Sequence, residues 1–342
     1  MKLLLLGGTR FLGRAVVDAA LARGHQVTLF TRGVQPNAWG AAVTMLAGNR
    51  DPAVAPGLTA LDAGSWDAVI DTSGYVPRVV GASANKLRDR VGRYLFVSSI
   101  SVYADMGMPG VDENAPVGTL DDPATEEVAK FYGPLKAACE DVVRKAYGSR
   151  ATIVRPGLIV GAHDPTDRFG YWVARFVRPQ LLGARGESAV LPAPRERPLQ
   201  VIDACDLGAW MLHAVENGID GTFNATSPAG RWTFADLVGV LVRQGGATAP
   251  RPVWIDEAQL LEHKVEPWTG LPMWLPGTFA ESGGMMQVDC RRAEGAGLHV
   301  RAIEDTVAAT AAWLEQRDNA SAWKIVLSAD AERELAAAVA LQ

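Results

Sequence analysis

The chain has 342 residues, with 33 Lys and Arg against 38 Asp and Glu, and so a formal net charge of −5. Its length suits one large domain or two smaller ones, and its 48% of apolar residues excludes a disordered or collagen-like chain. The slightly acidic balance argues against a surface for nucleic acid or anionic membranes, which requires clustered positive charge. Eight of the ten tryptophans lie between Trp172 and Trp323, which suggests that the two halves of the chain have different roles.

The cysteines and the N-terminus exclude further classes of protein. Cys139, Cys205 and Cys290 form no pattern typical of a disulfide framework or a zinc site, so we expect no metal. The apolar run at residues 3–6 is shorter than the core of a signal peptide, about 7–15 residues, or a membrane helix of about 20. We therefore expect a cytoplasmic protein without a membrane partner.

The first half of the chain alternates between strand and helix patterns. The apolar run at 2–6 predicts a buried strand, residues 11–23 have the apolar spacing of one helix face, and residues 25–30 predict a second strand. The pattern continues with strands at 66–74, 92–99 and 151–157 and helices at 78–90 and 134–147. This alternation predicts an α/β fold with a Rossmann-type doubly wound parallel sheet, which binds ligands beyond the carboxyl ends of its strands.

The second half is less regular, and residues 165–200 and 245–300 are rich in Pro, Gly and Trp. Between these segments, residues 198–215 and 221–228 predict a strand, a helix and a strand that rejoin the sheet. We therefore predict an NAD(P)-binding domain from residues 1–165 plus 200–230. Residues 166–199 plus 231–300 would form a smaller, discontinuous substrate-binding region, followed by C-terminal helices within 301–342.

The segment GGTRFLG at residues 7–13 lies between the first predicted strand and the first predicted helix. Glycine at position 7 permits a tight turn, glycine at position 13 permits close packing, and the free amides at the helix start can bind a pyrophosphate. The segment therefore predicts a dinucleotide-binding turn. The cofactor contacts expected from it are Gly7, Thr9, Arg10, Phe11, Leu12 and Gly13.

The residues that follow the second strand favour NADP(H) over NAD(H). A dinucleotide fold that prefers NAD carries Asp or Glu near this point, where it binds the 2′-hydroxyl of the ribose. This chain has Thr31 and Arg32 there, and it has Arg10 in the glycine turn. Arginine suits the oxygens of a 2′-phosphate, which a carboxylate would repel. The alternative is that both arginines are solvated surface charges.

Tyr132 and Lys136 are four residues apart on a predicted helix that should begin near Tyr132, because Pro134 is tolerated only in a first turn. A lysine ammonium near the phenol would favour the phenolate and lower the pKa of Tyr132 toward neutrality, where a general acid/base is effective. About 30 residues earlier, a strand ends in Ser98 and Ser99. A serine hydroxyl at that place can hydrogen-bond a substrate carbonyl or alcohol.

Five segments of the chain, in their order and spacing, resemble the extended short-chain dehydrogenase/reductase superfamily. They are GGTRFLG, VSSISVY, Tyr132-x-x-x-Lys136, the RPG segment at 155–157 and VIDACDL at 201–207. The GGTRF form is similar to an atypical branch that includes reductases and chloroplast stem-loop RNA-binding proteins. The resemblance implies that Tyr132 is the general acid/base, that Lys136 lowers its pKa and binds the nicotinamide ribose, and that Ser99 is the catalytic Ser/Thr. A homodimer is implied by the resemblance alone.

The resemblance and the predicted strand ends give further candidate site residues. Asn49, Arg50, Ser73, Gly74 and Pro156 are expected to face the cofactor. Ser101, His163, Trp268 and Trp274 are candidates for substrate contact, the two tryptophans because they lie in a Pro/Gly-rich loop. His163 and Asp164, with Asp167 and Arg168, could line the substrate cleft, but we interpret the polar segment at 163–168 chiefly as a solvated loop.

The leading hypothesis is an NADP(H)-dependent oxidoreductase that interconverts a secondary alcohol and a ketone. The substrate would be a small, sugar-like or cyclic molecule, and no nucleic-acid partner is expected. One alternative is an NAD(P)-dependent epimerase of a sugar or sugar nucleotide, and another is a dinucleotide-binding protein that binds RNA or has a regulatory role. Ile100 and Ser101 follow Ser99 where family dehydratases carry Asp-Glu, so 4,6-dehydration is disfavoured.

Overall fold

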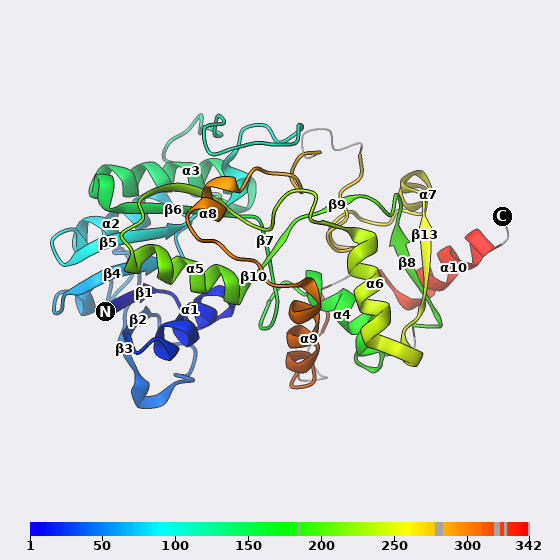
Figure 1. Cartoon of the computed structure of the whole chain (residues 1–342). Helices are drawn as coiled ribbons and strands as arrows, with labels where there is room; N and C mark the ends of the chain where they lie inside the picture. Colours follow the sequence, from blue (N-terminus) through cyan, green and yellow to red (C-terminus); the bar gives the residue numbers. More distant parts are fainter. Residues whose placement is uncertain (184, 278–282, 318–321, 325–326, 341–342) are drawn as a thin grey trace.

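A computed structural model of the chain describes residues 1–183, 185–277, 283–317, 322–324 and 327–340. Within these residues, a seven-stranded parallel sheet has the order β11-β6-β5-β4-β1-β2-β3 (Figure 1). Its strands are β1 (Lys2–Leu6), β2 (Gln26–Thr31), β3 (Val43–Ala47), β4 (Trp66–Asp71), β5 (Val91–Val97), β6 (Ala151–Pro156) and β11 (Gly221–Ala225). The strand order reverses at β1, which lies between β2 and β4, and the predicted Rossmann-type fold is thereby confirmed.

Helices cover both faces of this sheet. On one face α1 (Phe11–Ala22) packs against α5 (Ala204–Glu216), and on the other α2 (Pro77–Leu87) packs against α3 (Val128–Tyr147). Leu3 and Leu5 of β1 belong to the core on the first face, and Leu4 and Leu6 to the core on the second. Since successive side chains of a strand point to opposite faces, an unbroken run of leucine is what a strand covered on both sides requires.

Two details of the sheet differ from the prediction. Strand β3 was not predicted, because it is short and only partly buried at the sheet edge. The predicted strand near residue 200 does not rejoin the main sheet. It is divided into β9 (Pro198–Leu199), which pairs with β12 (Trp232–Thr233), and β10 (Val201–Asp203), which pairs with β7 (Leu158–Val160). From this part of the chain, only β11 among the described strands extends the sheet, beside β6.

The second half of the chain builds a separate hydrophobic core, on the right of Figure 1. Its helices and strands are α4 (Arg168–Val177), β8 (Ser188–Pro192), α6 (Phe234–Gly245), β13 (Arg251–Ile255), α7 (Glu257–Glu262), α9 (Ile303–Leu314) and α10 (Ala329–Ala340), while the short α8 (Arg291–Gly295) lies near β11. Helix α9 packs on α4 and α6, and α10 packs on β8. The described helices of the C-terminal segment are therefore part of this core rather than an appendage. Parts of that segment, 318–321, 325–326 and 341–342, lie outside the described residues.

The second core accounts for most of the tryptophan imbalance. Trp172 and Trp274 are fully buried in it, and five more tryptophans pack against it: Trp232, Trp254, Trp268, Trp313 and Trp323. Trp172 meets Phe234 edge-on, with ring centroids 5.4 Å apart. Most of the tryptophans in the second half therefore fill a core between irregular segments.

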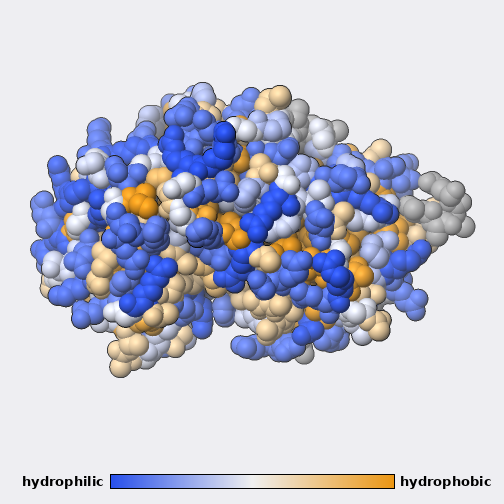
Figure 2. Space-filling model, in the orientation of Figure 1, coloured by the Kyte–Doolittle hydropathy of each residue, from blue (hydrophilic) through white to orange (hydrophobic). Residues whose placement is uncertain are grey.

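Figure 2 shows hydrophilic residues over most of one face, with hydrophobic residues scattered along its middle and over the half that contains the second core. Among the helices that the structure describes, none is both long and apolar enough to cross a membrane.

Candidate active site

A cavity of about 1060 Å³ lies at the carboxyl ends of the sheet strands and extends to the loop that precedes α4. Most of the predicted site residues line it: Gly7, Thr9, Arg10, Phe11, Leu12, Gly13, Thr31, Arg32, Asn49, Arg50, Ser73, Ser99, Ser101, Tyr132, Lys136, Pro156 and Trp268. The cavity thus joins residues from separate strands and loops at the position where doubly wound sheets bind their ligands.

The glycine turn between β1 and α1 has the geometry of a phosphate cradle. Gly7 and Gly8 have φ values of +102° and +104°, which favour glycine. A Cβ on Gly13 would lie 2.5 Å from the Cα of Gly8, so the helix approaches the turn as closely as its backbone allows. Arg10 precedes α1 without capping it through its side chain, and no acidic residue lies in the first turn. The first amides of α1 are therefore available to an anion in the cavity.

Arg10 and Arg32 are exposed at this end of the cavity. Neither forms an ion pair with any residue that the structure describes. Thr31 ends β2 beside them, and its hydroxyl accepts a hydrogen bond of 3.2 Å from the amide of Gly33. The two guanidinium groups are thus free to bind a ligand.

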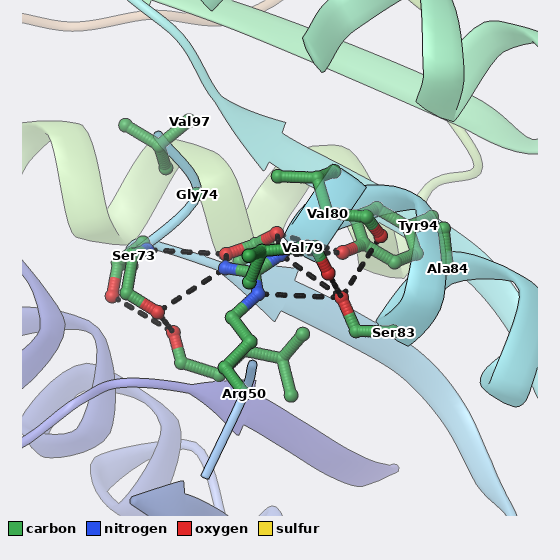
Figure 3. A network of polar contacts seen from close by, with 12 residues as sticks. Arg50, Ser73, Gly74, Val79, Val80, Ser83, Ala84, Tyr94 and Val97 are labelled. Carbon is green, nitrogen blue, oxygen red and sulfur yellow. Dashed lines mark hydrogen bonds and ion pairs between the residues drawn. The ribbon is translucent and has the colours of Figure 1, made fainter. Parts of the chain in front are cut away.

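Arg50 is oriented differently from the cofactor contact predicted for it. Arg50 lines the cavity, and its guanidinium forms a two-pronged ion pair with Asp71, which is completely buried. Figure 3 shows Arg50 in this polar network with Ser73, Ser83 and Tyr94. The Tyr94 hydroxyl donates to the same carboxylate at 2.7 Å, and Arg50 Nη2 donates to Ser83 at 3.1 Å. The guanidinium therefore supports the wall of the cavity from behind.

This buried network continues into the loop after β4. The Ser73 amide donates to Asp71 at 3.1 Å, and the Ser73 hydroxyl donates to the carbonyl of Leu6 at 3.0 Å. Gly74 follows and does not line the cavity, although it was predicted to face the cofactor. A Cβ at Gly74 would lie 2.5 Å from the Phe96 ring, and its carbonyl instead accepts a hydrogen bond from Lys136.

Lys136 on α3 is buried, and its ammonium lies at the base of the cavity. Nζ donates to the carbonyls of Gly74 and Val97, both at 2.6 Å, and lies 4.3 Å from the centroid of the Phe96 ring. Burial lowers the pKa of Lys136 to about 8. An ammonium has three N–H donors, so one remains for a ligand beside the two carbonyl bonds.

Tyr132 begins the regular part of α3, since Phe131 has the non-helical angles φ −118° and ψ 32°. This agrees with a helix predicted to begin near Tyr132. Burial and the neighbouring Tyr75 raise the pKa of Tyr132, while Ser99 and the charge of Arg168 oppose the rise. The pKa of Tyr132 is therefore raised rather than lowered as expected, and Lys136 is not among the groups that shift it.

Two serine hydroxyls lie at the end of β5, on the wall shared with Tyr132. The Ser99 hydroxyl donates to the Ser101 hydroxyl at 3.0 Å, and the Ser101 amide donates back to the Ser99 oxygen at 3.1 Å. The two groups therefore hold each other at the strand end. Both line the cavity and can reach a polar group of a bound molecule.

The structure separates the remaining substrate candidates. Trp268 lines the cavity, but Trp274 is fully buried and its Nε1 donates to Glu257 at 3.2 Å, so its predicted substrate contact is wrong. His163 does not line the cavity. Its ring lies 5.5 Å from that of Trp313, and burial lowers its pKa.

The polar segment at 163–168 is not a solvated loop. Asp164 and Asp167 are buried, and Asp167 accepts a hydrogen bond of 2.6 Å from Arg317. Arg168 is half-buried and lines the cavity, with its guanidinium 5.3 Å from the centroid of the Trp268 ring. The sequence signal for Arg168 was its place after the RPG strand, but the charges beside it suggested solvent.

Comparison with known proteins agrees with this geometry. No protein-family model matches the chain. The bovine epimerase family protein SDR39U1 is 26% identical over 266 residues, which span 75% of this chain and 83% of that protein. Human epimerase family protein SDR39U1 (isoform 2), in a crystal structure with NADPH, has a TM-score of 0.58 and 20% identity, covering 93% of this chain and 100% of the other.

UDP-N-acetylglucosamine 4-epimerase from Bacillus cereus is similar in fold, with a TM-score of 0.66 and 17% identity over 94% of this chain and 99% of the other. In fold and in sequence, the chain is thus similar to epimerase-family proteins.

Proposed function

We propose that this protein is an NADP(H)-dependent oxidoreductase that interconverts a secondary alcohol and a ketone by hydride transfer. The observation that carries the proposal is the meeting of Ser99, Tyr132 and Lys136 in one cavity with the glycine turn at Gly7. The cavity is large enough for a dinucleotide and a small substrate, since ligand sites commonly measure about 300–1,000 Å³.

The residues present fit a dinucleotide. The turn at Gly7 and Gly8 and the uncapped start of α1 would hold its pyrophosphate. Arg10 and Arg32 are exposed in the cavity and lack a carboxylate partner among the described residues, which supports a 2′-phosphate and thus NADP(H). The human SDR39U1 structure contains NADPH, whereas other similar structures contain NAD, so the proposed preference rests on the two arginines. When bound, the cofactor supplies or accepts the hydride.

The chain's own residues would manage the proton and the substrate oxygen. Because the pKa of Tyr132 is raised, its phenol is protonated at neutral pH and can donate the proton to a ketone oxygen during reduction. The Ser99 hydroxyl would donate a hydrogen bond to the same oxygen and stabilise the developing negative charge. Lys136 would use its third N–H to hold a ribose hydroxyl.

An epimerase with retained cofactor is the second candidate, and the relationship to epimerase-family proteins favours it. It would use the same proton and hydride steps in both directions. The two functions differ in their net consumption of reduced nicotinamide. An oxidoreductase consumes the cofactor stoichiometrically, whereas an epimerase leaves its amount unchanged.

The test follows the loss of absorbance of NADPH with a panel of ketones, including keto acids and sugar-derived ketones. We expect turnover by the wild type, and we expect Tyr132→Phe to reduce it by about 10²–10⁴-fold, the usual contribution of a general acid/base. Tyr75→Phe is the matched control, because Tyr75 lines the same cavity with its ring centroid 6.3 Å from that of Tyr132. Near wild-type turnover in Tyr132→Phe would show that the acid/base assignment is wrong.

A further inference from the structure

We infer that Arg168 forms a subsite for an anionic group of the substrate, a carboxylate or a phosphate. The inference rests on the proposed function and narrows it to alcohols and ketones that carry such a group. Arg168 was not among the predicted site residues, and it lines the same cavity as Tyr132, Ser101 and Trp268.

The side chain of Arg168 is held in a fixed orientation. Its Nε donates to the Thr166 hydroxyl at 2.9 Å, and its guanidinium lies 5.3 Å from the centroid of the Trp268 ring. Among the described residues, no acceptor binds its two Nη atoms. These atoms are the paired donors that recognise a carboxylate or phosphate in a two-pronged manner, and they are left for a ligand.

Arg168 borders the cavity, and it has no carboxylate partner within the described part of the chain. Arg50, Arg155, Arg175 and Arg317 each form an ion pair with an acidic side chain. Since a charge removed from water is normally paired, an arginine that borders a cavity without a partner indicates that the partner comes from outside the chain.

The charge of Asp164 acts on Arg168, but the two side chains form no ion pair. The pKa of Asp164 is raised by burial, and its Oδ1 accepts hydrogen bonds from the Thr166 amide at 2.9 Å and hydroxyl at 2.6 Å. Asp164 therefore orients Thr166, which in turn orients Arg168. The arrangement positions the guanidinium and leaves its Nη atoms unoccupied among the described residues.

The position of Arg168 also indicates where the anionic group would lie in the substrate. Arg168 and Tyr132 line the same cavity, and the charge of Arg168 opposes the rise in the pKa of the Tyr132 phenol. Arg10 and Arg32 instead lie with the glycine turn and the end of β2, at the proposed cofactor end. A substrate bound by Arg168 would thus carry its carboxylate or phosphate near the carbon that reacts.

The experiment measures binding of small anions to the protein saturated with NADP⁺, so that the cofactor end is filled. Inorganic phosphate and lactate are the anionic probes, and lactamide is the neutral analogue of lactate. Isothermal titration should detect phosphate, lactate or both at millimolar concentration, but not lactamide. Arg168→Gln should weaken the binding at least tenfold, and Arg168→Lys should keep part of it. The anion that binds more tightly distinguishes a phosphate from a carboxylate subsite.

Arg195→Gln is the matched control, because Arg195 also stacks on a tryptophan, 5.5 Å from the ring centroid of Trp254, but does not line the cavity. It should bind the anions like the wild type. Unchanged anion binding in Arg168→Gln, equal binding of lactamide, or no binding of either anion to the wild type would overturn the inference. NADP⁺ titration is a separate readout: if NADP⁺ does not bind, the proposed function fails, and the anion titrations on the free protein still test Arg168.

Discussion

Replacing Arg50 by methionine tests the buried network behind the cofactor wall. The variant leaves the carboxylate of Asp71 without its cation at a site with no solvent exposure. Removing one partner of a buried ion pair costs about 3–5 kcal/mol. The Tyr94 hydroxyl, at 2.7 Å, and the Ser73 amide, at 3.1 Å, still bind the carboxylate, so we expect the lower end, about 3 kcal/mol.

Urea unfolding followed by circular dichroism measures this loss as a lower midpoint with an unchanged slope. The double variant R50M/D71N removes the unpaired charge and should be more stable than R50M by about 1–2 kcal/mol, although it contains one more substitution. NADP(H) affinity should fall in R50M, because the network fixes the loop whose Gly74 carbonyl binds Lys136. A loss of stability below about 1 kcal/mol in R50M, or a double variant less stable than R50M, would refute this reasoning.

Two further predictions concern Trp274 and Lys136. Trp274→Ala should lower the free energy of unfolding, measured in urea, by about 3–5 kcal/mol, because its side chain is a large core residue. Trp268→Ala should lower it less and should change ligand affinity, because Trp268 lines the cavity. Equal losses of stability in the two variants would contradict this difference in placement. Burial lowers the pKa of Lys136 from 10.5 to about 8, so between these pH values the unfolded chain binds a proton that the folded chain does not. At about 1.36 kcal/mol per pKa unit, the free energy of unfolding of the wild type should rise by about 3 kcal/mol relative to that of Lys136→Met between pH 8 and pH 10.5. A difference between the two proteins that stays constant with pH would contradict the burial of the ammonium.

The parts of the site that could be predicted from the sequence depend on local rules. The glycine turn at 7–13 follows from backbone geometry, which permits few residue types, and Tyr132 and Lys136 follow from the spacing of a helix. The leucine run of β1 likewise follows from a strand that is covered on both faces. Each of these patterns is contained in fewer than about 15 residues, within the reach of a single supersecondary unit.

The parts that could not be predicted depend on contacts between distant segments. Trp268 and Trp274 lie in one Pro/Gly-rich loop, where no periodicity tells the cavity side from the core side. Arg50 was assigned to the cofactor because the sequence does not show its ion pair with Asp71. That partner lies 21 residues further along the chain, at the end of β4. Arg168 was taken as solvated because the sequence shows the acidic residues beside it but not that they bind other partners.

The central claim is that the cavity binds NADP(H) through the glycine turn and the two exposed arginines. Its most direct test is isothermal titration calorimetry of the wild type and of Arg32→Gln, each with NADPH and with NADH. The wild type should bind NADPH at least about tenfold more tightly than NADH, a difference of about 1.4 kcal/mol, and Arg32→Gln should lose most of this preference. Equal affinities in the wild type, or tighter binding of NADH, would contradict it.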